Sequence, residues 1–292
     1  MPSVSGKATY RVALIGRSLS HSISPIFQQA ANDYYGLPIS YELCEAEPHD
    51  LEGAVRGLRA VTCLGANVTV PYKEIVMQWM DELTEEATRT GAVNTIINRE
   101  GRLIGHNTDV QGFLRALDEA RFDAYEKRAL VLGAGGAARA VVVALAEAEA
   151  ASIVVTNRNR ARAEKLVAEL GDEMVEATSL AVGSGDENLD AILAQCDLLV
   201  NATPVGTTGG PADHDVAIDL TLLPKESLVF DLVYNPPRTR LLRAAERRGL
   251  QTMNGLAMLV HQGALSFEAW TGKRAPVGLM MARAKDALEG RA

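Results

Sequence analysis

RALVLGAGGAARA, from Arg128 to Ala140, is the stretch that decides the fold. A short apolar run, Ala129 to Leu132, stops at Gly133, and the segment rich in alanine and valine that follows is typical of a helix. Strand, glycine turn and helix with the pattern Gly-x-Gly-x-x-Ala predict a dinucleotide-binding βα unit. The alternative is a tight βα turn that holds no ligand.

The small residues of this turn each have a physical reason. We expect the chain to turn sharply at Gly133, the backbone at Gly135 to lie close to a pyrophosphate, and Ala138 to let the helix pack on the strand. The phosphates then face main-chain N–H groups at the positive end of the helix.

The next strand indicates which nucleotide is bound. Ser152 to Thr156 is β-branched and apolar, as expected of a buried parallel strand. A dinucleotide fold usually carries an acid after this strand, which binds the ribose 2′-hydroxyl of NAD. Here the sequence is NRNRAR, from Asn157 to Arg162. Arginine binds a 2′-phosphate, and cations at a helix start oppose the macrodipole unless an anion is present, so NADP is favoured over NAD. The alternative is a solvated basic helix start.

Composition excludes several function classes. The 292 residues suffice for one large or two ordinary domains, and the net charge of −8 argues against nucleic acid or an anionic membrane as partner. Cys44, Cys63 and Cys196 form neither a disulfide framework nor a metal spacing, which suits a reducing cytosol. We predict no metal, no signal peptide and no membrane span.

The first part of the chain predicts strands at 10–15, 40–46 and 63–69 and a hairpin of 95–98 with 103–105. We expect Ser24 to cap a helix that begins with Pro25. The hydroxyls of Ser22 and Ser24 either serve only that cap or form a seat for a carboxylate; local sequence leaves both open.

Polar residues gather at predicted strand ends and helix starts. We expect a helix to begin at Pro71, with Lys73 in its first turn, where the dipole disfavours a cation. Lys73 is either a solvated lysine or one aimed at an anion or a reacting oxygen, and Asp109 is either an N-cap or a functional acid. The group comprises Asn67, Thr69, Lys73, Asn94 and Asp109. Because ligands bind at this edge of an open α/β sheet, the group predicts a second site.

The rest of the chain predicts strands at 197–203 and 228–234 and helices at 161–170, 189–194, 239–249 and 255–270. We expect irregular structure at 171–188 and a loop at 205–211. The last of these helices carries Gln262, which is either a satisfied core amide or a ligand contact.

Eight blocks in a fixed order also resemble a known family. They are His21 to Pro25, Asn67 to Lys73, Gly91 to Thr95, Asn107 to Asp109, Gly133 to Ala137, Asn157-Arg158, Asn201 to Gly206 and Gly255 to Gln262. With these blocks the chain resembles the shikimate dehydrogenases along nearly its whole length.

The resemblance implies a two-domain α/β fold with a cleft between the domains. The implied substrate domain is discontinuous, 1–110 plus 255–292, and residues 111–254 form a Rossmann-type NADP-binding domain. The implied reaction is the reversible, NADP-dependent reduction of 3-dehydroshikimate to shikimate in aromatic amino-acid (chorismate) biosynthesis, in the cytoplasm.

The resemblance also assigns residues. Lys73 and Asp109 match the catalytic acid–base pair, and Ser22 and Ser24 match the serines that hold the substrate carboxylate. Further implied substrate contacts are Asn67, Thr69, Asn94, Tyr234 and Gln262. The implied NADP contacts are Gly133, Ala134, Gly135, Gly136, Ala137, Asn157, Arg158, Asn159, Arg160, Ala161, Arg162, Thr203, Leu232 and Gly255.

Some positions depart from the family pattern. The family often has proline at Ser18 and His-Asn at Gln28-Gln29, which leaves the substrate preference open. The alternatives are a quinate or aminoshikimate dehydrogenase on the same scaffold, and a regulator that binds NADP or shikimate without catalysis. The sequence leaves the oligomeric state open, with a homodimer as one option.

Overall fold

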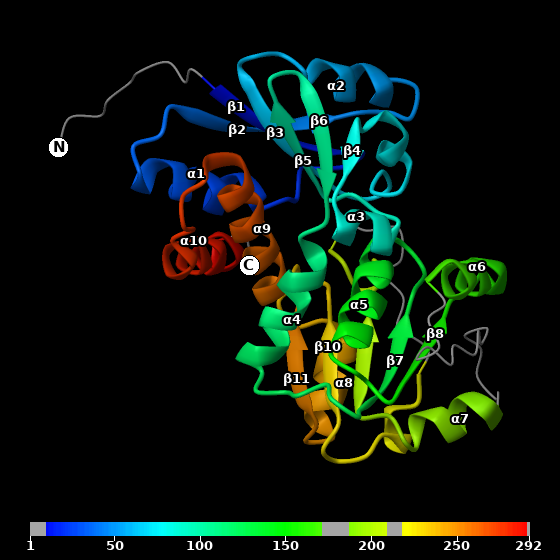
Figure 1. Cartoon of the computed structure of the whole chain (residues 1–292). Helices are drawn as coiled ribbons and strands as arrows, with labels where there is room; N and C mark the ends of the chain where they lie inside the picture. The colour runs from blue at the N-terminus through cyan, green and yellow to red at the C-terminus, as the bar shows by residue number, and fades with distance from the viewer. Residues whose placement is uncertain (1–9, 171–186, 209–217, 291–292) are drawn as a thin grey trace. The chain divides into compact units, whose positions relative to one another are not determined.

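The computed structural model describes residues 10–170, 187–208 and 218–290. Within them the chain separates into two compact units, one formed by 10–108 with 260–290 and the other by the described part of 109–259. Each unit contains a β-sheet with helices packed on it (Figure 1). The domain borders expected after residue 110 and before residue 255 lie near these unit borders. Residues 171–186 and 209–217, where we expected irregular structure and part of a loop, lie outside the described residues.

The first unit holds a mixed sheet in the order β2-β1-β3-β5-β6-β4. Its strands are β1 (Tyr10–Gly16), β2 (Ile39–Glu45), β3 (Cys63–Val68), β4 (Glu82–Leu83), β5 (Thr95–Arg99) and β6 (Arg102–His106). Its helices are α1 (Ser24–Tyr34), α2 (Leu51–Gly57), the 3₁₀-helix η1 (Ile75–Trp79), α3 (Glu85–Thr90), α10 (Val277–Glu289) and most of α9 (Leu256–Thr271).

Strand direction decides which ends meet in this sheet. β1 runs parallel to β2 and β3, whereas β5 runs antiparallel to β3, with Asn67 opposite Thr95. The carboxyl ends of β1 and β3 therefore lie at the same edge as the amino end of β5. We call this edge the substrate edge.

Alternating side chains of β1 pack into two hydrophobic cores, one on each face of the sheet. Ala13 and Ile15 face the core beneath α2, whereas Val12 and Leu14 face the core that Trp270 of α9 covers. On the second side α1 and α10 pack against each other (Figure 1).

The predicted hairpin is confirmed as β5 and β6. Its two-residue turn, Glu100-Gly101, has φ of 55° and 88°. Two positive φ values suit the right-handed twist of the flanking strands.

The second unit holds a five-stranded sheet in the order β11-β10-β9-β7-β8, and every pair is parallel. Its strands are β7 (Arg128–Leu132), β8 (Ser152–Thr156), β9 (Leu198–Asn201), β10 (Leu228–Asp231) and β11 (Gln251–Asn254). Its helices are α4 (Asp109–Glu119), α5 (Gly136–Glu147), α6 (Arg160–Leu170), α7 (Glu187–Leu193), the 3₁₀-helix η2 (Leu220–Leu222) and α8 (Arg240–Arg247).

The chain leaves β7 for β8 on one side and continues with β9 on the other, so the strand order reverses between β7 and β9. Ligands of doubly wound sheets bind at the carboxyl ends of strands at such a switch point. The nucleotide-binding type of α/β fold predicted from the sequence is confirmed. We call this edge of the second sheet the nucleotide edge.

Two local predictions are wrong. No helix begins at Pro71, because Tyr72 N–H donates to Thr69 O at 3.0 Å and closes a turn; the 3₁₀-helix η1 starts only at Ile75. Ser24 is not a helix cap: it is the first residue of α1, after Ile23, and no side chain caps that end. Instead the Ser22 hydroxyl accepts the Ser24 N–H at 3.2 Å.

Two strands end earlier than expected, and two were missed. The Asn201 side chain accepts the N–H of Thr203, and the Asp231 side chain accepts that of Val233, so both chains turn at the point where strands were expected to continue. The missed strands, β4 and β11, are short and partly polar, so the sequence pattern gave little indication of either. Within the described part of the chain, no helix has the length and apolarity needed to cross a membrane.

Candidate functional site

The substrate edge gathers several of the predicted contacts. Thr69 follows β3 directly, and its N–H donates to Ile15 O of β1 at 2.9 Å. The neighbouring Val68 N–H donates to Asn94 O at 2.8 Å. Asn67, Thr69 and Asn94 therefore lie together at the ends of β3 and β5, as the sequence predicted.

Lys73 reaches the same edge through its main chain. Its carbonyl accepts the Val93 N–H at 2.7 Å, which places the turn that carries Lys73 beside the segment that carries Asn94. The residue is half-buried. Asp109 is the first residue of α4 and of the second unit, and only 3% of it is exposed.

Two side-chain amides at this edge are firmly held. Asn94 Nδ2 donates to Thr108 Oγ1 at 2.8 Å and to Gln262 Oε1 at 3.1 Å. Asn67 Oδ1 accepts from Tyr41 OH at 2.8 Å, and its Nδ2 donates to Ser266 Oγ at 3.0 Å. The orientation of each amide is thus set by the protein.

The loop that carries Ser22 and leads to Ser24, the first residue of α1, follows β1 and so starts from the same edge. A Cβ on Gly16, where β1 ends, would lie 2.6 Å from Thr69 Cγ2, so this loop leaves the sheet in direct contact with the substrate edge. Ser22 is half-buried, whereas Ser24 is buried.

Gln28, which departs from the family pattern, has a structural role. Its Nε2 donates to Gly263 O at 2.8 Å and ties α1 to α9 directly after Gln262. Gln29 instead bonds to the main chain of β2: its Oε1 accepts the Tyr41 N–H at 3.2 Å.

The nucleotide edge requires glycine at Gly133. Its φ of +111° is rarely adopted by other residues, and a Cβ there would lie 3.0 Å from Ala202 O. The turn after β7 therefore contacts the chain that follows β9, where Thr203 lies.

Gly135 differs from Gly133 in its surroundings. A Cβ there would meet nothing within 4 Å, so the protein itself does not demand glycine. Gly135 precedes α5, and no side chain caps that helix end. Ala138 is fully buried, as expected for close packing of the helix on the sheet. The open space and the uncapped N–H groups fit the pyrophosphate of a dinucleotide.

The arginine segment is exposed at the start of α6. Arg160 forms an ion pair with Glu164 at 2.7 Å. Within the described residues, neither Arg158 nor Arg162 has an acidic partner. An uncompensated pair of cations at a helix start fits the extra phosphate of NADP.

A buried hydrogen-bond network supports the nucleotide edge, and sequence reasoning missed it. Asn201 Nδ2 donates to Asp231 Oδ1 at 2.8 Å, and Asn201 Oδ1 accepts from Thr203 Oγ1 at 2.6 Å. Burial raises the pKa of the Asp231 carboxyl, although the Thr239 hydroxyl and other donors oppose that shift. The sequence could have indicated this network, because a polar residue, Asn201 or Asp231, follows each of two apolar runs.

This network holds the chain at the predicted nicotinamide contacts. Leu232 N–H donates to Asn201 O at 2.9 Å. A Cβ on Gly255 would lie 1.9 Å from Leu232 O, so only glycine fits against that strand end. Tyr234 is half-buried in the segment after β10.

His106 lies at the end of β6, directly before Asn107. Its Nδ1 is 3.0 Å from Thr84 Oγ1 and 3.6 Å from a Glu86 carboxylate oxygen. Burial lowers the pKa of the imidazole, and the Glu86 charge opposes that shift.

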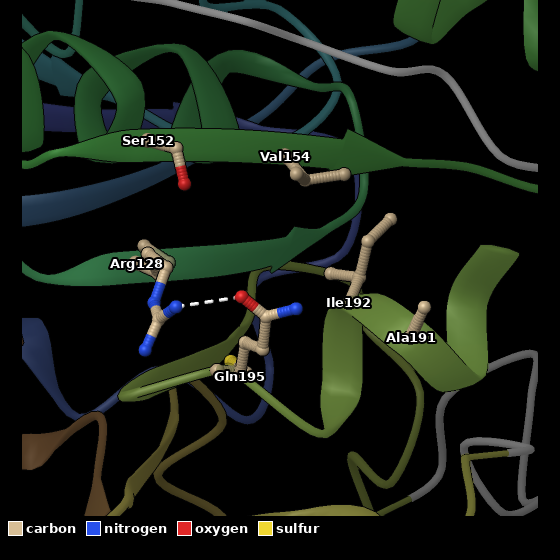
Figure 2. Close-up of a pocket in the computed structure, with 8 residues that line it drawn as sticks. Arg128, Ser152, Val154, Ala191, Ile192 and Gln195 are labelled. Carbon is tan, nitrogen blue, oxygen red and sulfur yellow. Dashed lines mark hydrogen bonds between the residues drawn. The ribbon is translucent and has the colours of Figure 1, made fainter.

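A cavity of about 200 Å³ lies away from the nucleotide edge, toward the amino ends of β7 and β8 (Figure 2). Figure 2 shows Arg128 reaching toward Gln195, to which it donates a hydrogen bond of 2.7 Å. Cys196 also lines the cavity, and burial raises the pKa of its thiol to about 12. The cavity therefore offers neither a free cation nor a reactive thiolate. Among the described residues, no three His, Cys, Asp or Glu side chains are grouped to hold a metal ion.

Three family models match successive parts of the chain. Residues 14–96 match the shikimate dehydrogenase substrate binding domain, 116–209 the shikimate / quinate 5-dehydrogenase model, and 255–285 the shikimate 5'-dehydrogenase C-terminal domain.

Whole proteins match over nearly the full length. A shikimate dehydrogenase (NADP(+)) of Symbiobacterium thermophilum is 45% identical over 96% of this chain and 95% of its own. A structure of shikimate 5-dehydrogenase from Thermus thermophilus, in complex with NADP(H) and shikimate, superposes with a TM-score of 0.82 at 39% identity, over 96% of this chain and 100% of that one. A quinate dehydrogenase from Corynebacterium glutamicum in complex with NAD has a TM-score of 0.84 at 31% identity, over 95% and 99% of the two chains.

Proposed function

Since this chain belongs to the shikimate dehydrogenase family, we propose that it catalyses the reversible, NADP-dependent reduction of 3-dehydroshikimate to shikimate. The observation that carries the proposal is the substrate edge, where the turn bearing Lys73 is bonded to the segment bearing Asn94, and Asn94 in turn to Gln262. Two side-chain amides at one strand edge, beside the turn that bears Lys73, suit a ring that carries several hydroxyl groups. The reaction would serve chorismate biosynthesis, the route to the aromatic amino acids.

The substrate is held by groups of different chemistry. The hydroxyls of Ser22 and Ser24, at the start of α1, bind the carboxylate. Thr69, Asn94 and Gln262 bind ring hydroxyls, and Tyr234 adds a further contact. In this structure the Asn67 amide bonds to protein groups, so a direct contact between Asn67 and the substrate stays a prediction.

Lys73 and Asp109 form the acid–base pair. Reduction of the carbonyl requires a proton on its oxygen, which the Lys73 ammonium group donates; in the reverse direction the neutral amine accepts the hydroxyl proton. The Asp109 carboxylate orients the amine and the hydroxyl.

NADPH, when bound, supplies the hydride. The main chain from Gly133 to Ala137 holds its pyrophosphate, and the segment from Asn157 to Arg162 holds its 2′-phosphate. Thr203, Leu232 and Gly255 line the nicotinamide.

An alternative substrate is quinate, because a quinate dehydrogenase shares the fold over nearly its full length. That relative was solved with NAD, however, whereas this chain carries Arg158 and Arg162 without acidic partners among the described residues. Aminoshikimate is a further candidate. A regulator without catalysis would not need an acid–base pair.

The test is the NADPH absorbance band, followed with shikimate or quinate and with NADP or NAD. We expect rapid NADP reduction with shikimate only. Faster turnover with quinate would move the protein to the alternative, and binding of shikimate without turnover would make it a regulator.

The catalytic assignment has its own test. Lys73→Ala should lose most turnover and keep its NADP affinity, whereas Lys225→Ala, at an exposed lysine of the second unit, should behave as the wild type. Near-normal turnover in Lys73→Ala would refute the assignment.

Location and assembly belong to the same proposal. The three free thiols support a cytoplasmic location. Strand β2 lies at the edge of the first sheet, and its Leu43 side chain is exposed. An exposed edge strand supports the pairing of two copies as a homodimer. Light scattering on the purified protein measures the assembly.

A further inference from the structure

Ser266 lies one helical turn after Gln262 on α9, and it is fully buried. Its hydroxyl donates to Gln262 O at 2.9 Å. Its oxygen lies 3.0 Å from Asn67 Nδ2, 2.8 Å from Thr95 Oγ1 and 3.2 Å from Thr108 Oγ1. One hydroxyl thus joins α9 to β3, to β5 and to the segment after β6.

The donors and acceptors of this cluster can be assigned. A serine hydroxyl donates one proton and accepts at two lone pairs. Because its proton is used by Gln262 O, the Asn67 amide and a threonine hydroxyl must donate to it. These partners are buried, so none of them can turn to bulk water instead.

The bonds continue from Ser266 to the predicted substrate contacts. Asn67 Nδ2 also donates to Asn94 O at 3.2 Å, and Asn94 Nδ2 donates to Gln262 Oε1 at 3.1 Å. Together with the bond from Ser266 to Gln262 O, these contacts form a closed ring. Both the main chain and the side chain of Gln262 are members of that ring.

The ring sets the direction of the Gln262 amide. Its Oε1 accepts from Asn94 Nδ2 at 3.1 Å, so this oxygen faces Asn94.

We infer that Ser266 is a positioning residue: it fixes Asn67 and Thr95, and through them it orients the Asn94 and Gln262 amides toward the hydroxyls of the substrate ring. The inference rests on the proposed function for the identity of the ligand. Ser266 is fully buried, so it acts through its hydrogen-bond partners, and no sequence pattern marked it.

Tyr41 contacts Asn67 on the side away from Ser266, and we call the chain of bonds from Tyr41 through Asn67 to Ser266 the relay. Its hydroxyl donates to Asn67 Oδ1 at 2.8 Å and so sets which way the Asn67 amide faces. Because Tyr41 and Ser266 both act through Asn67, their effects on substrate binding should be coupled.

The experiment compares Ser266→Ala with a matched control in the full-length protein. Ser227 is equally buried, its hydroxyl donates to Cys196 O at 2.7 Å, and it belongs to the second unit. Ser227→Ala thus removes a buried hydroxyl of the same kind away from the substrate edge. Shikimate KM, NADP KM, kcat and Tm are measured for both variants.

We expect both variants to lower Tm. Only Ser266→Ala should raise the shikimate KM, by about tenfold, which corresponds to about 1.4 kcal/mol. Its NADP KM should stay unchanged. A shikimate KM equal to that of Ser227→Ala would overturn the inference, because the role would then be structural only.

Tyr41→Phe and the double variant test the relay itself, also if Ser266→Ala does not fold. Tyr41→Phe should raise the shikimate KM, and the double variant should raise it by less than the product of the single effects. An unchanged KM in Tyr41→Phe, or effects that multiply, would overturn the relay through Asn67.

Failure of the proposed function gives a different pattern. A wild type without turnover refutes that function, and the inference is then tested by the shikimate Kd from calorimetry. Equal Kd values in wild type and Ser266→Ala overturn the inference, and no binding by the wild type overturns both.

Discussion

Gly135→Ala separates a ligand requirement from a folding requirement. Gly135 has an ordinary φ of −108°, and a Cβ there would meet nothing within 4 Å. Alanine lowers the entropy of the unfolded chain, which stabilises by about 0.4–1 kcal/mol, and it is a poorer helix cap by up to about 1 kcal/mol. The two effects nearly cancel, so the free energy of unfolding should change by less than about 1 kcal/mol.

Gly133→Ala is the comparison. Its φ of +111° costs other residues roughly 1–2 kcal/mol, and the new Cβ would press on Ala202 O at 3.0 Å. Overpacking adds roughly 1–3 kcal/mol. At about 2–4 °C for each kcal/mol in a domain of this size, Tm should fall by roughly 4–20 °C.

The assay is thermal unfolding without nucleotide, followed by NADP titration in a calorimeter. Gly135→Ala should keep the wild-type Tm and lose NADP affinity by at least about tenfold, because the Cβ occupies space that the pyrophosphate needs. Wild-type affinity in Gly135→Ala would show that the turn is a tight βα connection without a phosphate. Wild-type Tm in Gly133→Ala would refute the steric reasoning.

Two further predictions use matched controls. Arg158→Ala and Arg162→Ala should each raise the NADP KM by about tenfold, whereas Arg160→Ala, whose charge Glu164 already balances, should change it by less than about threefold; equal effects at all three positions would contradict the assignment, and initial rates measure them. His106→Gln should flatten the loss of Tm between pH 7.5 and 5.5: the native pKa lies below the usual value, so the unfolded state binds the proton first and wild-type stability falls as pH falls. His49→Gln, at an exposed histidine, should keep the wild-type slope; a wild-type slope in His106→Gln would show that His106 does not cause it.

The sequence predicted the parts of the fold that depend on local pattern. The apolar run before Gly133 and the β-branched run of β8 are confirmed as neighbouring parallel strands. The hairpin was marked by a turn that only glycine and a few other residues tolerate. Periodicity and turn chemistry are properties of short segments, so one sequence is enough to see them.

What the sequence missed depends on partners far along the chain. The start of η1 was placed too early at Pro71, because the Tyr72 to Thr69 turn, not helix propensity, sets the backbone there. Ser266 looked like one more residue of an apolar helix. Apart from Gln262 O on the same helix, its partners are 158 to 199 residues away, so no local pattern could mark it.

In both sheets a buried asparagine holds the chain at the end of a strand. At the end of a strand the backbone ladder stops, yet the next residues must be held rigidly if they carry ligand contacts. In each unit a buried asparagine at that point supplies both a donor and an acceptor: Asn67 joins Tyr41 to Ser266, and Asn201 joins Asp231 to Thr203. Aspartate would keep the acceptor and lose the donor, and serine could not span both partners. The amide therefore suits these two positions because it fixes its neighbours in both directions, and this need explains an asparagine at each edge without requiring that either one touch a ligand.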